Sequence, residues 1–288
     1  MIGGLSIQGN LLCVTWSAGR GHVFLYDLEA GERLSSWTLP AGPSGFSDAG
    51  GVAVDEHFRV FVADACNDCV HRFNAFGQNL GRLGSPVPAA GDRGRDRPGV
   101  LDRPHAVAVH RRRVFVACGE RPRRRGLQCF GVDGEVVRGL SARGDPAAKW
   151  GAPRGVLADA RGVVVADTLR ARLQCFRPDG TFVHELPCAI DGAPGRPAAL
   201  ARAADGAIVC VDHGVESRLV AVRPDGTGRD LTRRIGACRD PLAVTSGPQG
   251  CLFVLDHGGE RVIRLRPDLH FDAVVVDLAE HDFDVPLG

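Results

Sequence analysis

The residues best suited to bind a ligand are arginines, which are concentrated in the middle of the 288-residue chain. Between residues 91 and 143 there are 13 Arg and 6 acidic residues, a local net charge of +7 that leaves −6 for the remainder. Guanidinium groups bind phosphates and carboxylates through paired hydrogen bonds, so an exposed cluster of them could hold an anionic partner. We predict a binding site formed by Arg93, Arg95, Arg97, Arg103, Arg121, Arg123, Arg124, Arg125, Arg154, Arg170 and Arg172. The alternative is a set of solvated loops whose arginines are partly neutralised by nearby Asp and Glu.

The composition favours a protein as the anionic partner. Proteins that bind RNA or DNA usually stack bases on aromatic rings, whereas this chain has 1 Tyr and 3 Trp. RNA or another polyanion remains an alternative, and membership of a larger assembly stays open. The overall charge of +1 would not by itself attract nucleic acid or a membrane surface. Residues 268–288 contain six acidic residues and no Lys or Arg, so they would serve either as an acidic surface for another molecule or for solubility.

The ten cysteines are expected to be mostly structural. Cys129 and Cys175 occupy the same place in two Leu-Gln-Cys-Phe runs, where a small buried apolar side chain fits. Cys66 and Cys69 have the spacing of a redox motif or of half a zinc site, but no second pair follows at zinc-ribbon distance. We therefore expect reduced, buried thiols with these two as the exceptions, and no metal or cofactor.

The chain shows no targeting or membrane segment. No apolar run approaches the roughly 18 residues of a membrane-spanning helix, and residues 1–10 lack the basic start and apolar stretch of a signal peptide. We expect a cytoplasmic protein that does not contact a membrane.

An internal repeat must position these residues. Arg-Pro-Asp-Gly-Thr occurs at 177–181 and again at 223–227, and Arg-Pro-Asp occurs at 266–268. Upstream of each of these lies an apolar run that ends in Asp, and a similar run occurs near residue 60. These marker aspartates are Asp64, Asp167, Asp212 and Asp256. Each unit reads as four short strands joined by turns, which is typical of a β-propeller blade with a period of roughly 40 to 50 residues.

The repeat predicts an all-β fold, a six-bladed β-propeller of four-stranded antiparallel blades. We expect a single domain over 1–288, with blades near 1–40, 47–85, 103–142, 152–188, 196–235 and 240–279 and an acidic tail at 280–288. Because each unit supplies its own four strands in order, the ring should close by packing of blade one on blade six.

The second and fourth units resemble NHL repeats. The residues that carry this resemblance are 51–54, 60–64, 67, 70–73 and 76–77 in the second unit, and 153–156, 163–168, 173–176 and 179–180 in the fourth. The resemblance covers about 240 residues and implies an NHL-type propeller. Such propellers serve as protein scaffolds, as RNA binders and, in a few relatives, as enzymes. We therefore predict a non-enzymatic binding or scaffolding module that uses the loop-rich face near blades three and four.

Two enzyme families resemble the repeat and supply the alternative, a metal-assisted lyase or lactonase with its site in the central channel. Similarity to peptidyl-hydroxyglycine amidating lyases implies a zinc bound by channel histidines, and His105 matches that position. The equivalent positions in four other units hold no histidine: Gly50, Arg154, Ala198 and Leu242. His213 and His257 follow marker aspartates of adjacent blades and are expected to lie too far apart for one ion.

Similarity to regucalcin-like lactonases implies a channel calcium held by carboxylates. The four marker aspartates would suit such a hard cation. Their recurrence in nearly every blade instead favours a structural role, in which Asp accepts backbone N–H bonds within its own turn.

Overall fold

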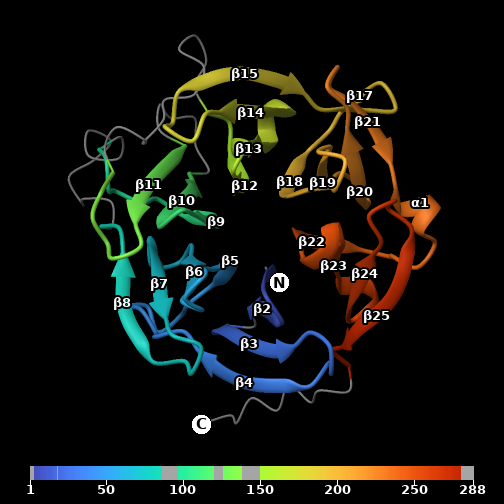
Figure 1. The fold of residues 1–288 in the computed structure, drawn as a ribbon. Coiled ribbons are helices and arrows are strands. Elements are labelled where there is room, and N and C mark those ends of the chain that lie inside the picture. The colour runs from blue at the N-terminus through green and yellow to red at the C-terminus, as the bar shows by residue number, and fades with distance from the viewer. Residues whose placement is uncertain (1–2, 18, 86–96, 120–125, 138–149, 280–288) are drawn as a thin grey trace.

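The computed structural model describes residues 3–17, 19–85, 97–119, 126–137 and 150–279, and within them it shows the predicted all-β, six-bladed propeller (Figure 1). Blades one and two contain, from the axis outward, β1 (Gly3–Gln8), β2 (Leu11–Ser17), β3 (Gly21–Asp27) and β4 (Arg33–Thr38), then β5 (Ala49–Val54), β6 (Val60–Asp64), β7 (Cys69–Phe73) and β8 (Asn79–Leu83). Blades three and four contain β9 (Pro104–His110), β10 (Arg113–Cys118) and β11 (Leu127–Gly131), then β12 (Pro153–Asp159), β13 (Gly162–Asp167), β14 (Arg172–Phe176) and β15 (Phe182–Pro187). Blades five and six contain β18 (Pro197–Arg202), β19 (Ile208–His213), β20 (Ser217–Val222) and β21 (Thr227–Asp230), then β22 (Pro241–Ser246), β23 (Leu252–Asp256), β24 (Arg261–Leu265) and β25 (Phe271–Asp277).

Burial along the strands follows from their place in the ring. The second strand of a blade is covered on both faces by neighbouring blades, so strands such as β6 and β13 are buried at every residue. Outer strands such as β4 lie on the rim and alternate partly buried with exposed residues (Figure 1). The apolar runs in the sequence are therefore the middle strands.

Two blades depart from four simple strands. In the described part of blade three, β11 is followed by a single bridge between Phe130 and Val136 instead of a fourth strand. Blade five is extended by the short hairpin β16 (Ala189–Ile190) and β17 (Ala193–Pro194). Blade five is also followed by the one-turn helix α1 (Thr232–Ile235). No helix in the described part of the chain is long and apolar enough to cross a membrane.

Among the strands of residues 3–279 that the structure describes, the ring closes without a shared strand, as the order of the repeats predicts. β1 pairs with β2, and β22 to β25 form a complete blade of their own. The closing contact is an apolar cluster with side chains from both blades. It includes Leu12, Phe24 and Tyr26 of blade one and Phe253 and Leu255 of blade six. Closure therefore depends on burial of apolar surface and not on strand exchange.

Candidate binding face and central channel

One face of the ring carries the links that lead into each inner strand and the turns between second and third strands. We call it the link face; its described residues include 19–20, 39–48, 65–68, 101–103, 119, 126, 150–152, 168–171, 195–196, 214–216, 236–240 and 257–260. The marker aspartates end the second strands of their blades and so lie just beneath this face. The Arg-Pro-Asp turns join third and fourth strands and therefore lie on the opposite face.

The marker aspartates join the link and the turn of each blade. Asp167 Oδ1 accepts hydrogen bonds from the backbone N–H groups of Gly151 at 2.6 Å and Ala152 at 3.2 Å. Asp256 Oδ1 does the same for Arg239 and Asp240, at 3.0 and 2.9 Å. The predicted role in binding backbone N–H groups is confirmed. For Asp167 and Asp256 the donors lie in the preceding link, whereas Asp64 also accepts from Cys66 and Asn67 in its own turn, as predicted.

None of the marker aspartates lines the channel, so they do not form a calcium site there. Their second carboxylate oxygen bonds a basic residue on the third strand instead. Asp167 Oδ2 accepts from Arg172 Nε at 3.0 Å, and Asp256 Oδ2 accepts from Arg261 Nε at 3.2 Å. Arg218 pairs with Asp212 in the same way.

The placement of Arg172 in an exposed binding patch is wrong. Arg172 is only 7% exposed, and its guanidinium pairs with Glu185 as well as with Asp167. The reason is strand register: Arg172 lies directly opposite Asp167, so it joins two strands and does not reach solvent.

Four of the predicted arginines are exposed in the structure: Arg97, Arg103, Arg154 and Arg170. Arg103, Arg154 and Arg170 lie on or beside the link face, in blades three and four. Arg97 lies near β11, where its carbonyl oxygen accepts a 3.5 Å hydrogen bond from Gln128. The remaining residues of the prediction lie outside the described residues: Arg93, Arg95, Arg121, Arg123, Arg124 and Arg125, as does the acidic tail at 280–288.

Arg154 and Arg170 are available to a ligand. Both residues are exposed, and neither pairs with a carboxylate in the part of the chain that the structure describes. Leu169, next to Arg170, is 60% exposed, and Val215 in the equivalent turn of blade five is fully exposed. Nothing in the sequence distinguishes these two apolar residues as exposed, although both come two or three positions after a marker aspartate.

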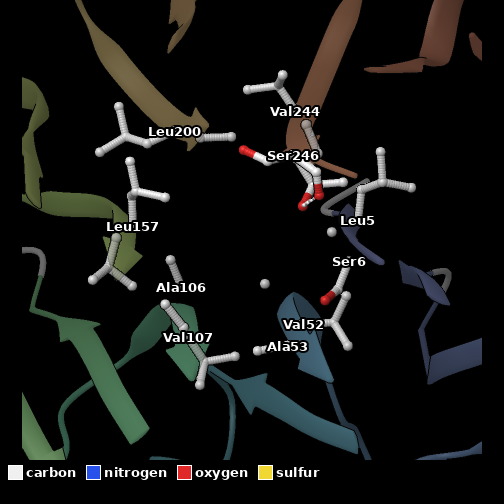
Figure 2. A pocket seen from close by; sticks show the side chains of 18 of the residues that line it. Leu5, Ser6, Val52, Ala53, Ala106, Val107, Leu157, Leu200, Val244 and Ser246 are labelled. Atoms are coloured by element: carbon white, nitrogen blue, oxygen red, sulfur yellow. Dashed lines mark hydrogen bonds between the residues drawn. The ribbon is translucent and has the colours of Figure 1, made fainter. Parts of the chain in front are cut away.

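A cavity of about 660 Å³ runs along the ring axis. The inner strands of all six blades line it, and apolar side chains such as Leu5, Val52 and Val107 gather around it with Leu200 and Val244 (Figure 2). The channel wall is therefore mainly aliphatic in its middle.

Polar groups occur where the channel meets the link face. His105, Arg154 and His213 line the cavity at that end. Burial lowers the pKa of His213 below its ordinary value, and the nearby positive charge of Arg154 lowers it further. Its Nε2 is buried and has no hydrogen-bond partner among the described residues. Burial and the Arg154 charge thus both disfavour protonation of His213.

His257, which follows the marker aspartate of blade six as His213 follows that of blade five, does not lie at this end of the channel. His257 does not line the cavity and packs against Trp16, with ring centroids 5.3 Å apart. Among the described residues, no cluster of potential metal ligands includes His105, His213 or His257.

The cysteines are largely buried, as predicted. All ten are free thiols, seven of them buried, and Cys66 is exposed. Cys69, by contrast, is 2% exposed, so the expectation that both residues of this pair are accessible is wrong for Cys69. Burial and the nearby Asp64 carboxylate raise the pKa of Cys69 to about 12. It faces inward because it pairs directly with Asp64 across the strands.

No family model and no curated protein matches this chain. Solved structures do resemble it. A streptogramin B lyase has 13% identity over 93% of this chain and 80% of its own, with a TM-score of 0.62. The nidogen–laminin complex contains a chain with 18% identity, 92% coverage of both chains and a TM-score of 0.60. A catalytically inactive virginiamycin B lyase from Staphylococcus aureus, solved with quinupristin, has 12% identity over 93% of this chain and 82% of its own, with a TM-score of 0.59. At these identities the likeness shows the fold alone.

Proposed function

We propose that the protein is a non-enzymatic binding module that holds an acidic segment of a partner protein on its link face, near blades three and four. The observation that carries this proposal is the pair Arg154 and Arg170, exposed at one end of blade four and without carboxylate partners in the described chain. Some other arginines already pair with carboxylates, as Arg59 does with Asp55 and Arg172 with Asp167. Arg20, Arg196 and Arg239 are also exposed on the link face, but they belong to blade one and to the links into blades five and six.

A protein suits this surface better than RNA does. Leu169 offers an exposed apolar contact next to Arg170, Val215 offers another in the equivalent turn of blade five, and protein interfaces combine such contacts with a polar rim. Tyr26 and Trp150, which could stack on bases, are fully buried, and the exposed rings of Phe46, Phe58, Phe76 and Phe271 belong to the link into blade two, to blade two and to blade six, not to blades three and four. Carboxylates of the partner would pair with the guanidiniums while its apolar side chains cover Leu169.

We further infer that the repeats are of the NHL type and that the protein works in a reducing compartment such as the cytoplasm. The repeat residues 51–54 and 60–64 form the inner and second strands of blade two, as that resemblance implies. The ten free thiols are compatible with a reducing environment.

Charge reversal with a matched control tests the binding site. The test variant carries Arg103→Glu, Arg154→Glu and Arg170→Glu. The control carries Arg177→Glu, Arg223→Glu and Arg266→Glu, three exposed arginines in turns of the opposite face. Both variants change the net charge equally, so a difference between them reports location and not total charge.

Affinity for an oligoglutamate peptide is measured by calorimetry, and the thermal unfolding of each variant confirms that it is folded. We expect the test variant to weaken binding at least about tenfold and the control to change it much less. Equal losses in both variants would show non-specific attraction and contradict the proposed site. Tighter binding of an oligouridylate, with a steep dependence on salt, would contradict a protein partner.

A second candidate is small-molecule chemistry in the channel. The observation that favours it is His213 Nε2, which is buried without a partner in the described residues and lies beside Arg154 at the end of a large cavity. The lyases among the structural neighbours suggest the probe. Incubation with quinupristin, followed by mass spectrometry, would show turnover that His213→Ala removes if this candidate is correct.

A further inference from the structure

Blade two contains a buried cluster of three different ligand groups. Asp64 ends β6, Cys69 begins β7 and His71 lies two residues further along β7. Their exposures are 0%, 2% and 6%. Cys69 Sγ lies 3.6 Å from His71 Nε2, and His71 Nε2 lies 3.1 Å from Asp64 Oδ2.

The cluster departs from the plan of the other blades. The residue directly opposite the marker aspartate is Arg172 in blade four, Arg218 in blade five and Arg261 in blade six. In blade two this position holds Cys69. A histidine bonded to Asp64 would be enough to replace the lost guanidinium, so the thiol beside it is not explained by that structural role.

Two of the three distances between ligand atoms lie close to the spacing that a zinc ion requires. With Zn–S near 2.3 Å and Zn–N or Zn–O near 2.0 to 2.1 Å, tetrahedral angles place sulfur and nitrogen about 3.6 Å apart and nitrogen and oxygen about 3.3 Å apart. The two measured distances, 3.6 and 3.1 Å, are close to these values. The three ligand atoms all lie within 4.8 Å of one another.

The surroundings hold the aspartate in place. Asp64 Oδ1 accepts backbone N–H bonds from Asp48, Cys66 and Asn67, at 3.1 to 3.2 Å. Asn67 Nδ2 donates to Asp64 Oδ2 at 2.7 Å and also to the carbonyl oxygen of Phe46 at 3.1 Å. Such outer hydrogen bonds orient metal ligands. The link from blade one therefore lies against the cluster, and the turn at Cys66 is its exposed side.

We propose that Asp64, Cys69 and His71 form a binding site for a zinc-class divalent transition-metal ion, with water in the fourth position. Thiolate and imidazole favour zinc over calcium or magnesium, which prefer oxygen ligands alone. Binding releases the thiol proton to solvent, and the imidazole proton moves to Nδ1 so that Nε2 can bind the ion. The bound ion would cross-link β6 and β7 on the side of blade two that packs against the link from blade one.

Cobalt titration tests the site because cobalt bound to a thiolate gives a charge-transfer band in the near ultraviolet. Wild-type protein should give this band with a stoichiometry of one cobalt per chain. Cys69→Ser should abolish it, and His71→Gln should weaken cobalt binding by more than about 100-fold, beyond the loss of an outer hydrogen bond. Cys66→Ser is the matched control, since it removes an exposed thiol three residues away and should leave the band intact.

Anomalous scattering from zinc-soaked crystals of the wild-type protein provides a test that needs no variant. A single peak among Asp64, Cys69 and His71 is expected. No charge-transfer band in the wild type, a band lost with Cys66→Ser but kept in Cys69→Ser, or zinc peaks only at surface residues would each overturn the proposal.

Discussion

At the residue scale, each marker aspartate joins three parts of its blade. One carboxylate oxygen binds backbone N–H groups of the incoming link, and the other binds a basic side chain of the third strand. Asp167 and Asp256 are fully buried, so their charge requires both sets of donors. This arrangement positions the link face, because the link and the turn that form it are held by the same side chain.

Replacing Asp167 with Ala should destabilise the fold strongly. The change removes the buried carboxylate that pairs with the buried Arg172, and loss of one member of a buried ion pair costs about 3 kcal/mol or more. Asp272→Ala is the control, since it breaks an exposed pair with Arg264 and should cost less than about 1 kcal/mol. Urea denaturation measures both free energies of unfolding, and equal losses would contradict the structural role of Asp167.

The pKa of His213 should depend on Arg154. Burial and the Arg154 charge both lower this pKa in the folded protein, so Arg154→Ala should raise it part of the way toward the ordinary value. Because the folded pKa is depressed, the stability associated with neutral His213 is present above its unfolded pKa and is lost as the pH falls through the folded value. Arg154→Ala should therefore reduce this loss. Histidine NMR titration, with Arg177→Ala as the control, would contradict the geometry if the His213 pKa did not rise.

The candidate site was predictable only where a residue's environment follows from its place in the repeat. Arg103 and Arg170 lie in exposed connections and Arg154 is the second residue of β12, so their exposure at the strand ends could be inferred. Arg172 could not be separated from them, because its burial depends on its pairing with Asp167 across two strands. The same cross-strand pairing places Cys69 beside Asp64, which the Cys66–Cys69 spacing alone does not reveal.

At the scale of the elements, inner strands must approach closely where six blades meet at the axis. A Cβ atom on Gly155 of β12 would lie 1.7 Å from the carbonyl oxygen of Ala198 in β18. This contact joins blades four and five beside Arg154. Gly155 therefore allows β12 and β18 to pack closely where the channel meets the link face.

Gly155→Ala should force β12 and β18 apart and lower the melting temperature. Overpacking of this kind costs roughly 1 to 3 kcal/mol. Gly214→Ala provides the control, because a Cβ there would meet its nearest atoms at 3.3 and 3.5 Å in an exposed turn. Equal melting temperatures for the two variants would show that the ring adjusts at this point without strain.

Regular strands were easier to predict than their exceptions. Apolar runs that end in Asp give β6, β13, β19 and β23 directly, since the middle strands of a propeller are buried on both faces. In the described part of blade three a single bridge at Val136 replaces the fourth strand. This was not predictable, because the turn before Val136 could equally well have been followed by a full strand.

At the scale of the whole molecule, apolar packing between complete blades holds the ring together. Most cysteines contribute to this packing as small buried side chains, including Cys13 and Cys210, both 0% exposed. The packed ring therefore shields these thiols from solvent, and they become accessible to reagents only when the blades separate.

Thiol labelling should report this protection. Under native conditions we expect one thiol, Cys66, to react readily, with faster reaction at higher pH because its pKa is raised by partial burial and by nearby carboxylates. Cys66→Ser should remove this phase, and denaturant should expose the buried thiols. Native labelling of all ten thiols at one common rate would contradict the packed ring.

The charge of the molecule is polarised along the chain, and the link face near blades three and four is where we expect that polarity to act. Long-range attraction would bring an acidic segment to this face, and Leu169 would then contribute an apolar contact after docking. Salt should therefore weaken binding without abolishing it.

Hydrogen exchange of the protein saturated with an oligoglutamate peptide tests the binding face most directly. Our account predicts slower amide exchange in the turn at 168–171 and in the links at 101–103 and 150–152, with little change in the Arg-Pro-Asp turns of the opposite face. Protection confined to that opposite face or to the channel strands, or no protection at all under saturating peptide, would contradict it.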